Sequence, residues 1–402
     1  MLLPMQPIFL ADRPIRRHFL KITSVEAIAI CIDPEDNSLS QVAGENPAEL
    51  NEIERIRRRN LSRHQTCLVR IETDTGDVGW GEGQESVAPR VIKTVIDDIC
   101  APMVIGRNPF DIEAIWNTQY QFLREAGHLT GFYIDALAGI DLALFDLIGK
   151  AVGQPVHRLL GGQVRDRLWA YTGFGGRDPD ATAEMAADHV AQGFRALKIH
   201  SPRLPVDQCI EIARAVRSRV GDDIALMLDV HISKTVSESI QLGRVLEELN
   251  FHWLESPTAP EDPYGSADIA RALDIQIASG EWLRTTWQWR EFLEAHALDV
   301  AMPDISRSGL TESKRIAQLC DTYNIPVAPH VGRGGTIALA ATIQFSATIP
   351  NFQIIEHMHQ VHEQRSKICT TYPSPVDGEF LVSDTPGMGI TIDEDAVRSY
   401  AI

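Results

Sequence analysis

Three acidic residues stand at a fixed interval, each at the end of a strand-like segment. Asp229 ends ALMLD, Glu255 ends HWLE and Glu281 follows QIASG, with 26 positions from each to the next. The same spacing continues downstream at Asp304, His330 and Glu356. A short strand, a helix of about a dozen residues and two loops fill such an interval, which is the repeating unit of a closed parallel β/α barrel.

The carboxyl ends of the strands form the active face of such a barrel. Carboxylates at the ends of three neighbouring strands therefore point toward one place, and converging oxygen ligands are what Mg²⁺ and similar hard cations prefer. The sequence predicts that Asp229, Glu255 and Glu281 bind one Mg²⁺ per subunit, and Mn²⁺ would suit the same three carboxylates.

Eight segments that alternate with amphipathic helical patterns are the predicted strands of the barrel. They are residues 168–173, 195–200, 225–230, 252–256, 276–280, 299–304, 326–331 and 352–357. At 402 residues the chain is long enough for a barrel of about 250 residues and a second domain.

The first 150 residues follow a different pattern, which is typical of an α+β domain. The predicted strands are residues 21–32, 66–72 and 73–83, and the predicted helices are residues 88–104, 109–126 and 131–150. The polar stretch 33–64 is expected to form a long loop that covers the site. The turn-rich residues 361–402 are expected to return to this first domain.

The charge and the apolar content of the chain limit its partners. The formal net charge is −18, so neither nucleic acid nor an anionic membrane is an expected partner, because both need a basic face. Prolines interrupt the N-terminal segment, which lacks the apolar run of a signal peptide, and no segment approaches the roughly 20 apolar residues that cross a bilayer. The six cysteines include no C-x-x-C pair, which favours a reducing compartment. A cytoplasmic location is therefore predicted.

Together the motifs resemble the enolase superfamily and, within it, the mandelate racemase-like branch with its galactonate- and mannonate-type acid-sugar dehydratases. They are VGWGEG, AGIDLALFDLIGKAVGQPVHRLLGG, ALKIH, LMLDVH, WLESP, IASGE, PDISRSGLTE and APHVGRGG, and they span nearly the whole chain. The resemblance implies a (β/α)₇β TIM-like barrel at residues 151–360. It also implies an α+β capping domain at residues 1–150, completed by residues 361–402, and an even-numbered homo-oligomer.

The resemblance further implies removal of a proton next to a carboxylate, and the predicted metal site suits that reaction. Loss of the α-proton of an ionised carboxylate places a second negative charge on the same group, which only a cation makes tolerable. Mg²⁺ would bind the substrate carboxylate and stabilise this charge as it develops. The alternative is that the three carboxylates only cap helices or pair with arginines.

Lys198 and His200 occupy alternate positions at the end of the second barrel strand, so both side chains face the same side. Lys198 is a candidate to bind the substrate carboxylate and to keep the pKa of a neighbouring base low. Racemases of the resembled family carry Lys-x-Lys here, and the second lysine is a base. His200 takes the position of that second lysine. A histidine can still act as a base, but the change argues against racemisation with a base on each face of the substrate. A binding or packing role for His200 is the alternative.

His330 and Asp304 end neighbouring strands, so the carboxylate can orient the imidazole and raise its basicity. In the resembled family this pair abstracts or returns the α-proton, which makes His330 the first candidate for the general base. Glu356 is a candidate to donate a hydrogen bond to the substrate when protonated, or to accept one from a substrate hydroxyl. A structural His330 and a plain surface Glu356 are the alternatives.

His231 lies two positions after Asp229 and is expected to project toward the same centre. Galactonate and mannonate dehydratases of the resembled family place a histidine here, and its implied role is to protonate the departing β-hydroxyl. An imidazole satisfied by a nearby loop is the alternative. Glycine clusters at 173–176 and 332–335 could cradle a phosphate, but they do not match a P-loop or Rossmann motif. Tight turns that admit substrate are the preferred interpretation, with Arg333 as a candidate substrate contact.

These assignments predict an Mg²⁺-dependent hydro-lyase that removes the α-proton of a sugar acid and eliminates its β-hydroxyl to give a 2-keto-3-deoxy acid. An epimerase or racemase, or a cycloisomerase of a sugar acid or its lactone, is the alternative on the same scaffold. His231 as an acid distinguishes the dehydratase from a racemase. A sugar-acid-binding protein without turnover is the third alternative, and it would not need the pair of Asp304 and His330.

Overall fold

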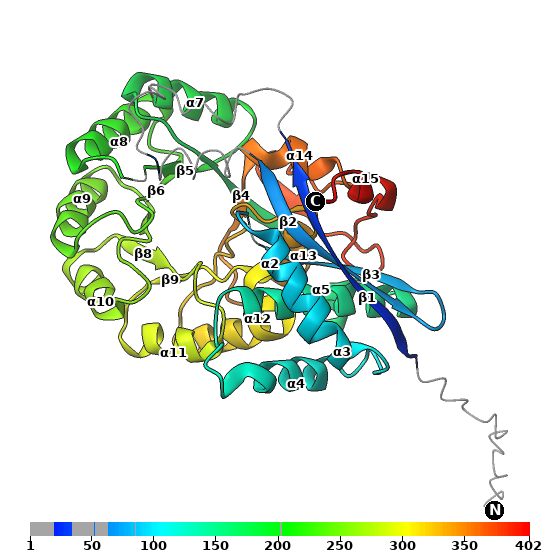
Figure 1. Cartoon of the computed structure of the whole chain (residues 1–402). Coiled ribbons are helices and arrows are strands. Elements are labelled where there is room, and N and C mark those ends of the chain that lie inside the picture. Colours follow the sequence, from blue (N-terminus) through cyan, green and yellow to red (C-terminus); the bar gives the residue numbers. More distant parts are fainter. Residues whose placement is uncertain (1–19, 34–51, 53–62, 85, 202) are drawn as a thin grey trace, which may run out of the picture.

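The computed structural model describes residues 20–33, 52, 63–84, 86–201 and 203–402. A ring of strands with helices on its outside occupies one side of the molecule, and a three-stranded sheet with its own helices occupies the other (Figure 1). The predicted loop at 33–64 and the N-terminal segment lie almost entirely outside the described residues.

Parallel strands form the ring. They are β4 (Arg167–Phe174), β5 (Ala196–His200), β6 (Ala225–Asp229), β7 (Trp253–Glu255), β8 (Gln276–Ser279), β9 (Val300–Ala301) and β10 (Ile355–His357). The first six pair in chain order, and β10 pairs with β4. Val327 closes the ring, because it bridges Ala301 on one side and Phe352 on the other.

Seven of the eight predicted barrel strands are regular strands in the described chain, and the predicted strand at 326–331 forms only isolated bridges. Pro326 and Pro329 explain this difference, since proline has no N–H to donate to a neighbouring strand. Buried side chains from the strands and from residues beside them pack together as one cluster: Tyr171, Ala196, Met227, Trp253, Ala278, Val300, Met302, Ala328 and Ile354.

Helices connect the strands on the outside of the ring. They are α7 (Pro179–Ala191), α8 (Val206–Val220), α9 (Val236–Glu248), α10 (Pro263–Ala272), α11 (Thr286–Glu294), α12 (Ile305–Thr322) and α13 (Thr336–Ser346). Polar residues start several of them: Asp178 and Asp262 accept first-turn N–H groups, and Thr235 forms a capping box with Glu238. This alternation confirms the predicted (β/α)₇β architecture.

An antiparallel sheet of β1 (Ile22–Ile32), β2 (His64–Thr73) and β3 (Val78–Gly83) makes up the second part. Its helical segments are α2 (Pro89–Val95), η3 (Ile96–Cys100), α3 (Ala101–Val104), α4 (Ile112–Arg124) and α5 (Phe132–Val152), followed by the short α6 (Val156–Leu159). We call β1 to β3 and α2 to α5 the cap. Its strands and helices match those predicted from the sequence.

Three glycines let β3 pack directly on α5. Gly79, Gly81 and Gly83 alternate along the strand, so all three face the helix. A Cβ atom at Gly81 would lie 2.0 Å from the carbonyl oxygen of Gly139, and one at Gly79 would lie 2.2 Å from that of Ala143. Neighbouring glycines of this set are two strand residues apart, or about 6.7 Å. One turn of the helix, about four residues, rises about 6 Å, so each glycine contacts a successive turn of α5. α5 in turn packs on α12 of the barrel.

The C-terminal segment touches both parts. It contains η4 (His359–Val361), α14 (His362–Ser366), β11 (Glu379–Leu381) and α15 (Glu394–Ser399). β11 pairs antiparallel with β4 of the barrel, whereas Ala401 bridges Ile30 of the cap. The domain boundaries at residues 150 and 360 remain predictions.

Candidate active site

Six predicted residues gather at the carboxyl end of the ring and are buried: Asp229, Glu255, Glu281, Asp304, His330 and Glu356. Asp229 and Glu255 are register partners on β6 and β7, and Asp304 and His330 face each other across a parallel bridge. Residues spaced 26 positions apart thus lie side by side, because equal intervals place them at equivalent positions of neighbouring strands around the ring.

Asp304 orients the imidazole of His330. Its Oδ2 atom lies 2.8 Å from Nδ1 of His330. Its Oδ1 atom accepts hydrogen bonds from the backbone N–H of Ser306 at 3.0 Å and from the Ser306 hydroxyl at 2.6 Å. A carboxylate so anchored fixes the ring orientation and leaves Nε2 as the nitrogen that faces the site. This is the predicted geometry of a base and its orienting carboxylate.

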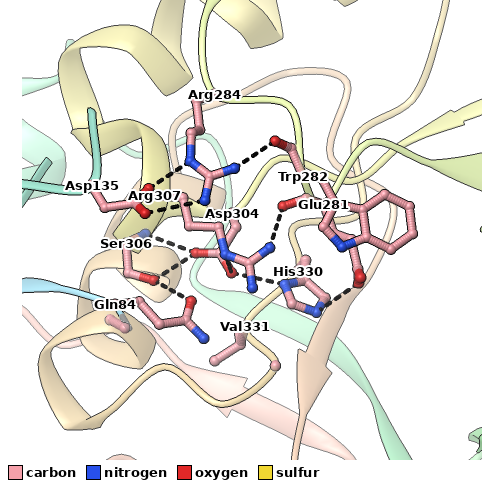
Figure 2. A network of polar contacts seen from close by, with 12 residues as sticks. Gln84, Asp135, Glu281, Trp282, Arg284, Asp304, Ser306, Arg307, His330 and Val331 are labelled. Carbon is pink, nitrogen blue, oxygen red and sulfur yellow. Dashed lines mark hydrogen bonds and ion pairs between the residues drawn. The ribbon is translucent and has the colours of Figure 1, made fainter. Parts of the chain in front are cut away.

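Carboxylates surround the other side of the same imidazole. Nε2 of His330 lies 2.9 Å from Oε2 of Glu281 (Figure 2). The same nitrogen lies 3.7 Å from Oε2 of Glu356. Burial alone would lower the pKa of His330, but the charges of Glu281 and Glu356 and the hydrogen bond to Asp304 hold it well above its ordinary value. The contact with Glu281 therefore controls whether His330 is neutral and able to accept a proton.

The buried side chain of Lys198 contacts two carboxylates and a hydroxyl group in the same site. Its ammonium lies 2.7 Å from Oε1 of Glu255, 2.8 Å from Oε1 of Glu356 and 3.3 Å from the Tyr171 hydroxyl. Burial alone would lower the pKa of Lys198, but these two carboxylates outweigh it and hold the pKa well above its usual range. Lys198 is thus a charged residue that fixes two glutamates, one at the end of β7 and the other within β10.

Glu356 is ionised in this setting. Its Oε2 atom accepts hydrogen bonds from the backbone N–H groups of Val331 at 2.9 Å and Gly332 at 2.7 Å. Burial works against ionisation, but Lys198 and His330 hold the pKa of Glu356 well below its ordinary value. Of the two roles considered for Glu356, this favours accepting a hydrogen bond over donating one.

Two histidines hold Asp229. Its Oδ2 atom lies 3.0 Å from Nδ1 of His200, and its Oδ1 atom accepts the backbone N–H of His231 at 2.7 Å. The far nitrogen of His200 is buried against Gly173, where a Cβ atom would approach it to 2.6 Å. The imidazole of His200 is therefore wedged between β4 and Asp229, which favours an orienting role for this residue.

His231 begins a strained turn after β6. Its φ is 46° and that of Ile232 is 55°, a left-handed region that side chains branched at Cβ rarely adopt. Such strain costs roughly 1–3 kcal/mol per residue and concentrates at functional sites. The half-exposed imidazole of His231 places Nδ1 3.5 Å from Oε1 of Glu281. Glu281 thus lies between two imidazoles, with one oxygen toward His231 and the other toward His330.

A cavity of about 550 Å³ lies beside His231, between the loops that follow β5 and β6. Arg203 and Lys234 are among its lining residues. The ammonium of Lys234 donates to the Leu204 carbonyl at 2.7 Å and to the Ser233 hydroxyl at 2.9 Å. The volume is in the range of small-molecule pockets.

Arg333 faces the cap in this structure. Its Nη2 atom donates to the carbonyl oxygen of Arg63, directly before β2, at 2.7 Å. Gly332 has a φ of 48° and packs so tightly on His330 that a Cβ atom would lie 2.3 Å from the ring. The cluster at 332–335 is thus a tight turn beside the dyad, while substrate contact by Arg333 stays a prediction.

The chemistry of Asp229, Glu255 and Glu281 fits a hard divalent cation, because all three are buried carboxylates at adjoining strand ends. Their oxygens are instead directed at Lys198 and at the nitrogens of three histidines. No group of three His, Cys, Asp or Glu side chains in the described chain already has the geometry of a metal site. The donor set therefore fits the ion, and binding it requires these contacts to rearrange.

Residues that the sequence analysis missed connect the cap to this site (Figure 2). The Gln84 amide satisfies its partners when its nitrogen faces Ser306 Oγ at 2.8 Å and Asp304 Oδ2 at 2.9 Å. The backbone contact of Ser306 could have been found, because an N-cap aspartate commonly accepts the N–H group of the second helical residue. Gln84 lies 222 positions from Ser306, a separation that local sequence patterns do not report.

A second set of contacts, also missed from the sequence, fixes the loop that carries Glu281. Arg284 forms a two-pronged ion pair with Asp135 of α5, at 2.6 and 3.1 Å, and donates to the Trp282 carbonyl at 2.8 Å. Arg307 donates to the backbone carbonyl of Glu281 at 2.7 Å. The cap thus helps to position a predicted metal ligand.

Both parts of this arrangement occur in known families. Residues 47–161 match the mandelate racemase / muconate lactonizing enzyme N-terminal domain, and residues 181–396 match the enolase C-terminal domain-like family. The chain belongs to the enolase superfamily. This confirms the resemblance seen in its sequence motifs and, with the relatives below, places the chain in the mandelate racemase-like branch.

Three relatives illustrate the range of this branch. D-galactarolactone cycloisomerase of Agrobacterium fabrum is 33% identical over 359 residues, which cover 85% of this chain and 92% of that protein. D-xylonate dehydratase of Haloferax volcanii is 30% identical over 360 residues, which cover 83% of this chain and 85% of that protein. The crystal structure of 3,6-anhydro-D-galactonate cycloisomerase from Zobellia galactanivorans has a TM-score of 0.83 at 28% identity, with 95% and 99% of the two chains covered.

This enolase superfamily member is therefore an enzyme related to sugar-acid dehydratases and cycloisomerases. Superfamily members generally bind Mg²⁺ and use a lysine or histidine base. Within the described residues, no helix is both long and apolar enough to pass through a bilayer.

Proposed function

We propose that this protein is an Mg²⁺-dependent dehydratase of a sugar acid, which gives a 2-keto-3-deoxy acid. The observation that carries the proposal is the position of Glu281 between the imidazoles of His330 and His231. Elimination needs a base for the α-proton and an acid for the β-hydroxyl, and two imidazoles on either side of one proposed metal ligand can supply both. The dehydratases among the relatives support the same reaction class.

Asp229, Glu255 and Glu281 would hold Mg²⁺ in the proposed enzyme. The ion would act as a Lewis acid that stabilises negative charge on the substrate carboxylate. Mn²⁺ suits the same ligands.

His330 is the proposed general base. Nε2 takes the α-proton, while Asp304 on Nδ1 stabilises the imidazolium that forms. His231 is the proposed general acid: its imidazole gives a proton to the β-hydroxyl as the C–O bond breaks, and water leaves. The enol that results becomes the 2-keto group, so one water is lost and no oxidant or reductant is needed.

The remaining predicted residues take supporting roles in this proposal. Lys198 holds Glu255 and Glu356 in place and supplies positive charge near the substrate carboxylate. Glu356 accepts a hydrogen bond from a substrate hydroxyl, and His200 orients Asp229. Arg333 is the proposed contact for the far end of the substrate. The cavity beside His231 offers room for the rest of the carbon chain.

A cycloisomerase is the second candidate, because two of the relatives carry that name. The same base and acid would act on a substrate whose leaving oxygen belongs to a ring, so that the ring changes and no water is lost. The two candidates differ only in the fate of this oxygen.

The deciding experiment is incubation of the purified protein with Mg²⁺ and a panel of hexonates, pentonates, aldarates and their lactones in D₂O, followed by proton NMR. A 2-keto-3-deoxy product supports the dehydratase and names the substrate. A ring-changed isomer would favour the cycloisomerase. Loss of the α-proton signal without either product would overturn both and indicate an epimerase, and silence across the panel would overturn the sugar-acid proposal.

Two further proposals concern the setting of the enzyme. We propose a homo-oligomer of even number in the cytoplasm, with a small-molecule sugar acid as the ligand of each subunit. Light scattering of the purified protein tests the assembly, and fractionation of cells that express it tests the location.

A further inference from the structure

Four histidines form a cluster outside the proposed active site. His357 directly follows Glu356 on β10 and faces the opposite side, away from the barrel interior, because successive strand side chains alternate. His359 in η4 and His362 at the start of α14 come next in the chain. His189 is contributed by the last turn of α7. The proposed chemistry uses none of the four.

The rings of three members form a nearly equilateral triangle. The centroid of His357 lies 6.2 Å from that of His359 and 6.0 Å from that of His362, and the last two centroids are 6.3 Å apart. His189 lies 5.8 Å from His359. The centre of such a triangle is about 3.6 Å from each ring, whereas a Zn–N distance of 2.0–2.1 Å places an imidazole centroid about 3.2 Å from the ion. The ring centroids therefore need to shift by only a few tenths of an ångström, and the rings must also turn to direct a nitrogen at the centre.

Three ring nitrogens of the cluster lack partners among the described residues. Nδ1 of His357, of His362 and of His189 is buried and has no hydrogen-bond partner among the described residues. His357 is only 2% exposed, so its unpartnered nitrogen is a cost that a ligand would remove. His359 is exposed and gives the cluster a route to solvent.

Charge around the cluster selects the kind of ion. Burial, Arg365 and the neighbouring histidines lower the pKa of His357 to about 3, and burial with similar neighbours lowers that of His362. These imidazoles are neutral at ordinary pH, which is the state that coordinates metals. The nearby charge of Arg365 opposes any cation held by charge alone, so only an ion with strong affinity for nitrogen would stay.

We propose that His357, His359 and His362, with His189 beside them, bind a transition-metal ion such as Zn²⁺, Ni²⁺ or Cu²⁺ at a site separate from the catalytic carboxylates. As with those carboxylates, no three of these ligands already converge in the part of the chain that the structure describes, so the rings turn on binding. The ion would clamp η4 and α14 against β10, the strand that carries Glu356.

The test uses the full-length, tag-free protein, freed of metals and then equilibrated with micromolar Zn²⁺ in the presence of excess Mg²⁺, which competes with Zn²⁺ for the proposed carboxylate site. Bound zinc is counted by mass spectrometry after dialysis. The key variant is His359→Gln, because the exposed His359 can be replaced without disturbing the core. His128→Gln changes another exposed histidine, far along the chain in the loop before α5, and serves as the matched control.

The expected result is one Zn²⁺ per chain in the wild type and in His128→Gln, and at least tenfold weaker binding in His359→Gln. Zn²⁺ should also raise the unfolding temperature of the wild type and of His128→Gln but not that of His359→Gln, and Co²⁺ should give the visible absorption of a nitrogen-ligated ion in the same two proteins only. Equal zinc binding in all three proteins, or none in the wild type, would overturn the proposal. None of these readouts depends on turnover, so the result is independent of the proposed function.

Discussion

His330 carries the first step of the proposed reaction, and its replacement separates chemistry from binding. We predict that His330→Asn lowers kcat by about 10²–10⁴-fold, since this is the usual contribution of a positioned general base. Exchange of the α-proton with D₂O should fall by the same factor, which NMR measures directly. Undiminished exchange in the variant would assign the base to another residue, with His200 the next candidate.

His231 decides between elimination and simple proton exchange. In His231→Gln the base remains, so the α-proton should still exchange with solvent, while release of the 2-keto-3-deoxy product should fall by about 10²-fold or more. The ratio of exchange to product, followed in one NMR experiment, is the measurement. A parallel loss of both signals would show that His231 supports the site without acting as the acid, and the exposed His128→Gln variant should change neither.

The residues of the site could be predicted to the extent that they follow the repeat. Asp304 and His330 end adjacent predicted strands 26 positions apart, and the structure places Oδ2 of Asp304 2.8 Å from Nδ1 of His330. The partners of Lys198 could not be predicted, because its ammonium reaches across the ring to residues of β7 and β10. Spacing tells which side chains meet at a face but not which charges pair there.

At the scale of elements, the loop after β8 depends on α5 of the cap. Asp135 holds Arg284, which in turn holds the Trp282 carbonyl next to Glu281. We predict that Asp135→Asn loosens this loop, raises the Mg²⁺ concentration needed for half-maximal turnover several-fold and destabilises the protein by about 1–3 kcal/mol, because a charged hydrogen bond is lost in a buried place. Mg²⁺ titration of activity and urea unfolding measure the two effects.

Glu184→Gln is the matched control for this prediction, since it removes a carboxylate that also forms a two-pronged pair, with Arg219, but on the exposed surface. Its Mg²⁺ dependence and its stability should stay close to those of the wild type. If Asp135→Asn behaves in the same way, the cap does not position Glu281 through this contact.

Elements were predictable where a periodic pattern is long. The helices of the barrel and the cap follow from apolar periodicity, and the strands from short apolar runs between turn residues. The segment at 326–331 shows the limit: its pattern is that of a strand, yet its prolines restrict it to isolated bridges. The pairing of β11 with β4 was not predicted, because the tail was expected to meet the first domain and no local pattern reports so distant a partner.

At the scale of the whole molecule, buried histidines link stability to pH. Burial lowers the pKa of five described histidines below its ordinary value: His64, His189, His252, His357 and His362. Each is neutral when folded but gains a proton in the unfolded chain once the pH falls below about 6.5. Their contribution to stability is therefore present above about pH 6.5 and is lost as the pH falls toward the folded pKa.

His330 has the opposite effect on stability, because its pKa is raised in the folded protein. Its contribution to stability is fully present below about pH 6.5 and is lost as the pH rises through the folded pKa. In a stability profile of the wild type alone, these opposing pH dependences overlap. The effect of one histidine is therefore obtained by comparing the wild type with a variant that lacks it. His64 is the best single reporter, because it is fully buried and neither ring nitrogen has a partner among the described residues.

We predict that His64→Phe flattens the acid side of the stability profile. The free energy of unfolding in urea should fall less steeply between about pH 6.5 and 5 in the variant than in the wild type, by up to about 1.4 kcal/mol per pH unit for one proton. The ring is replaced by one of similar size, so the folded state is kept while the titrating group is removed. Profiles that stay parallel through this range would show that His64 takes up its proton in the folded protein as readily as in the unfolded chain.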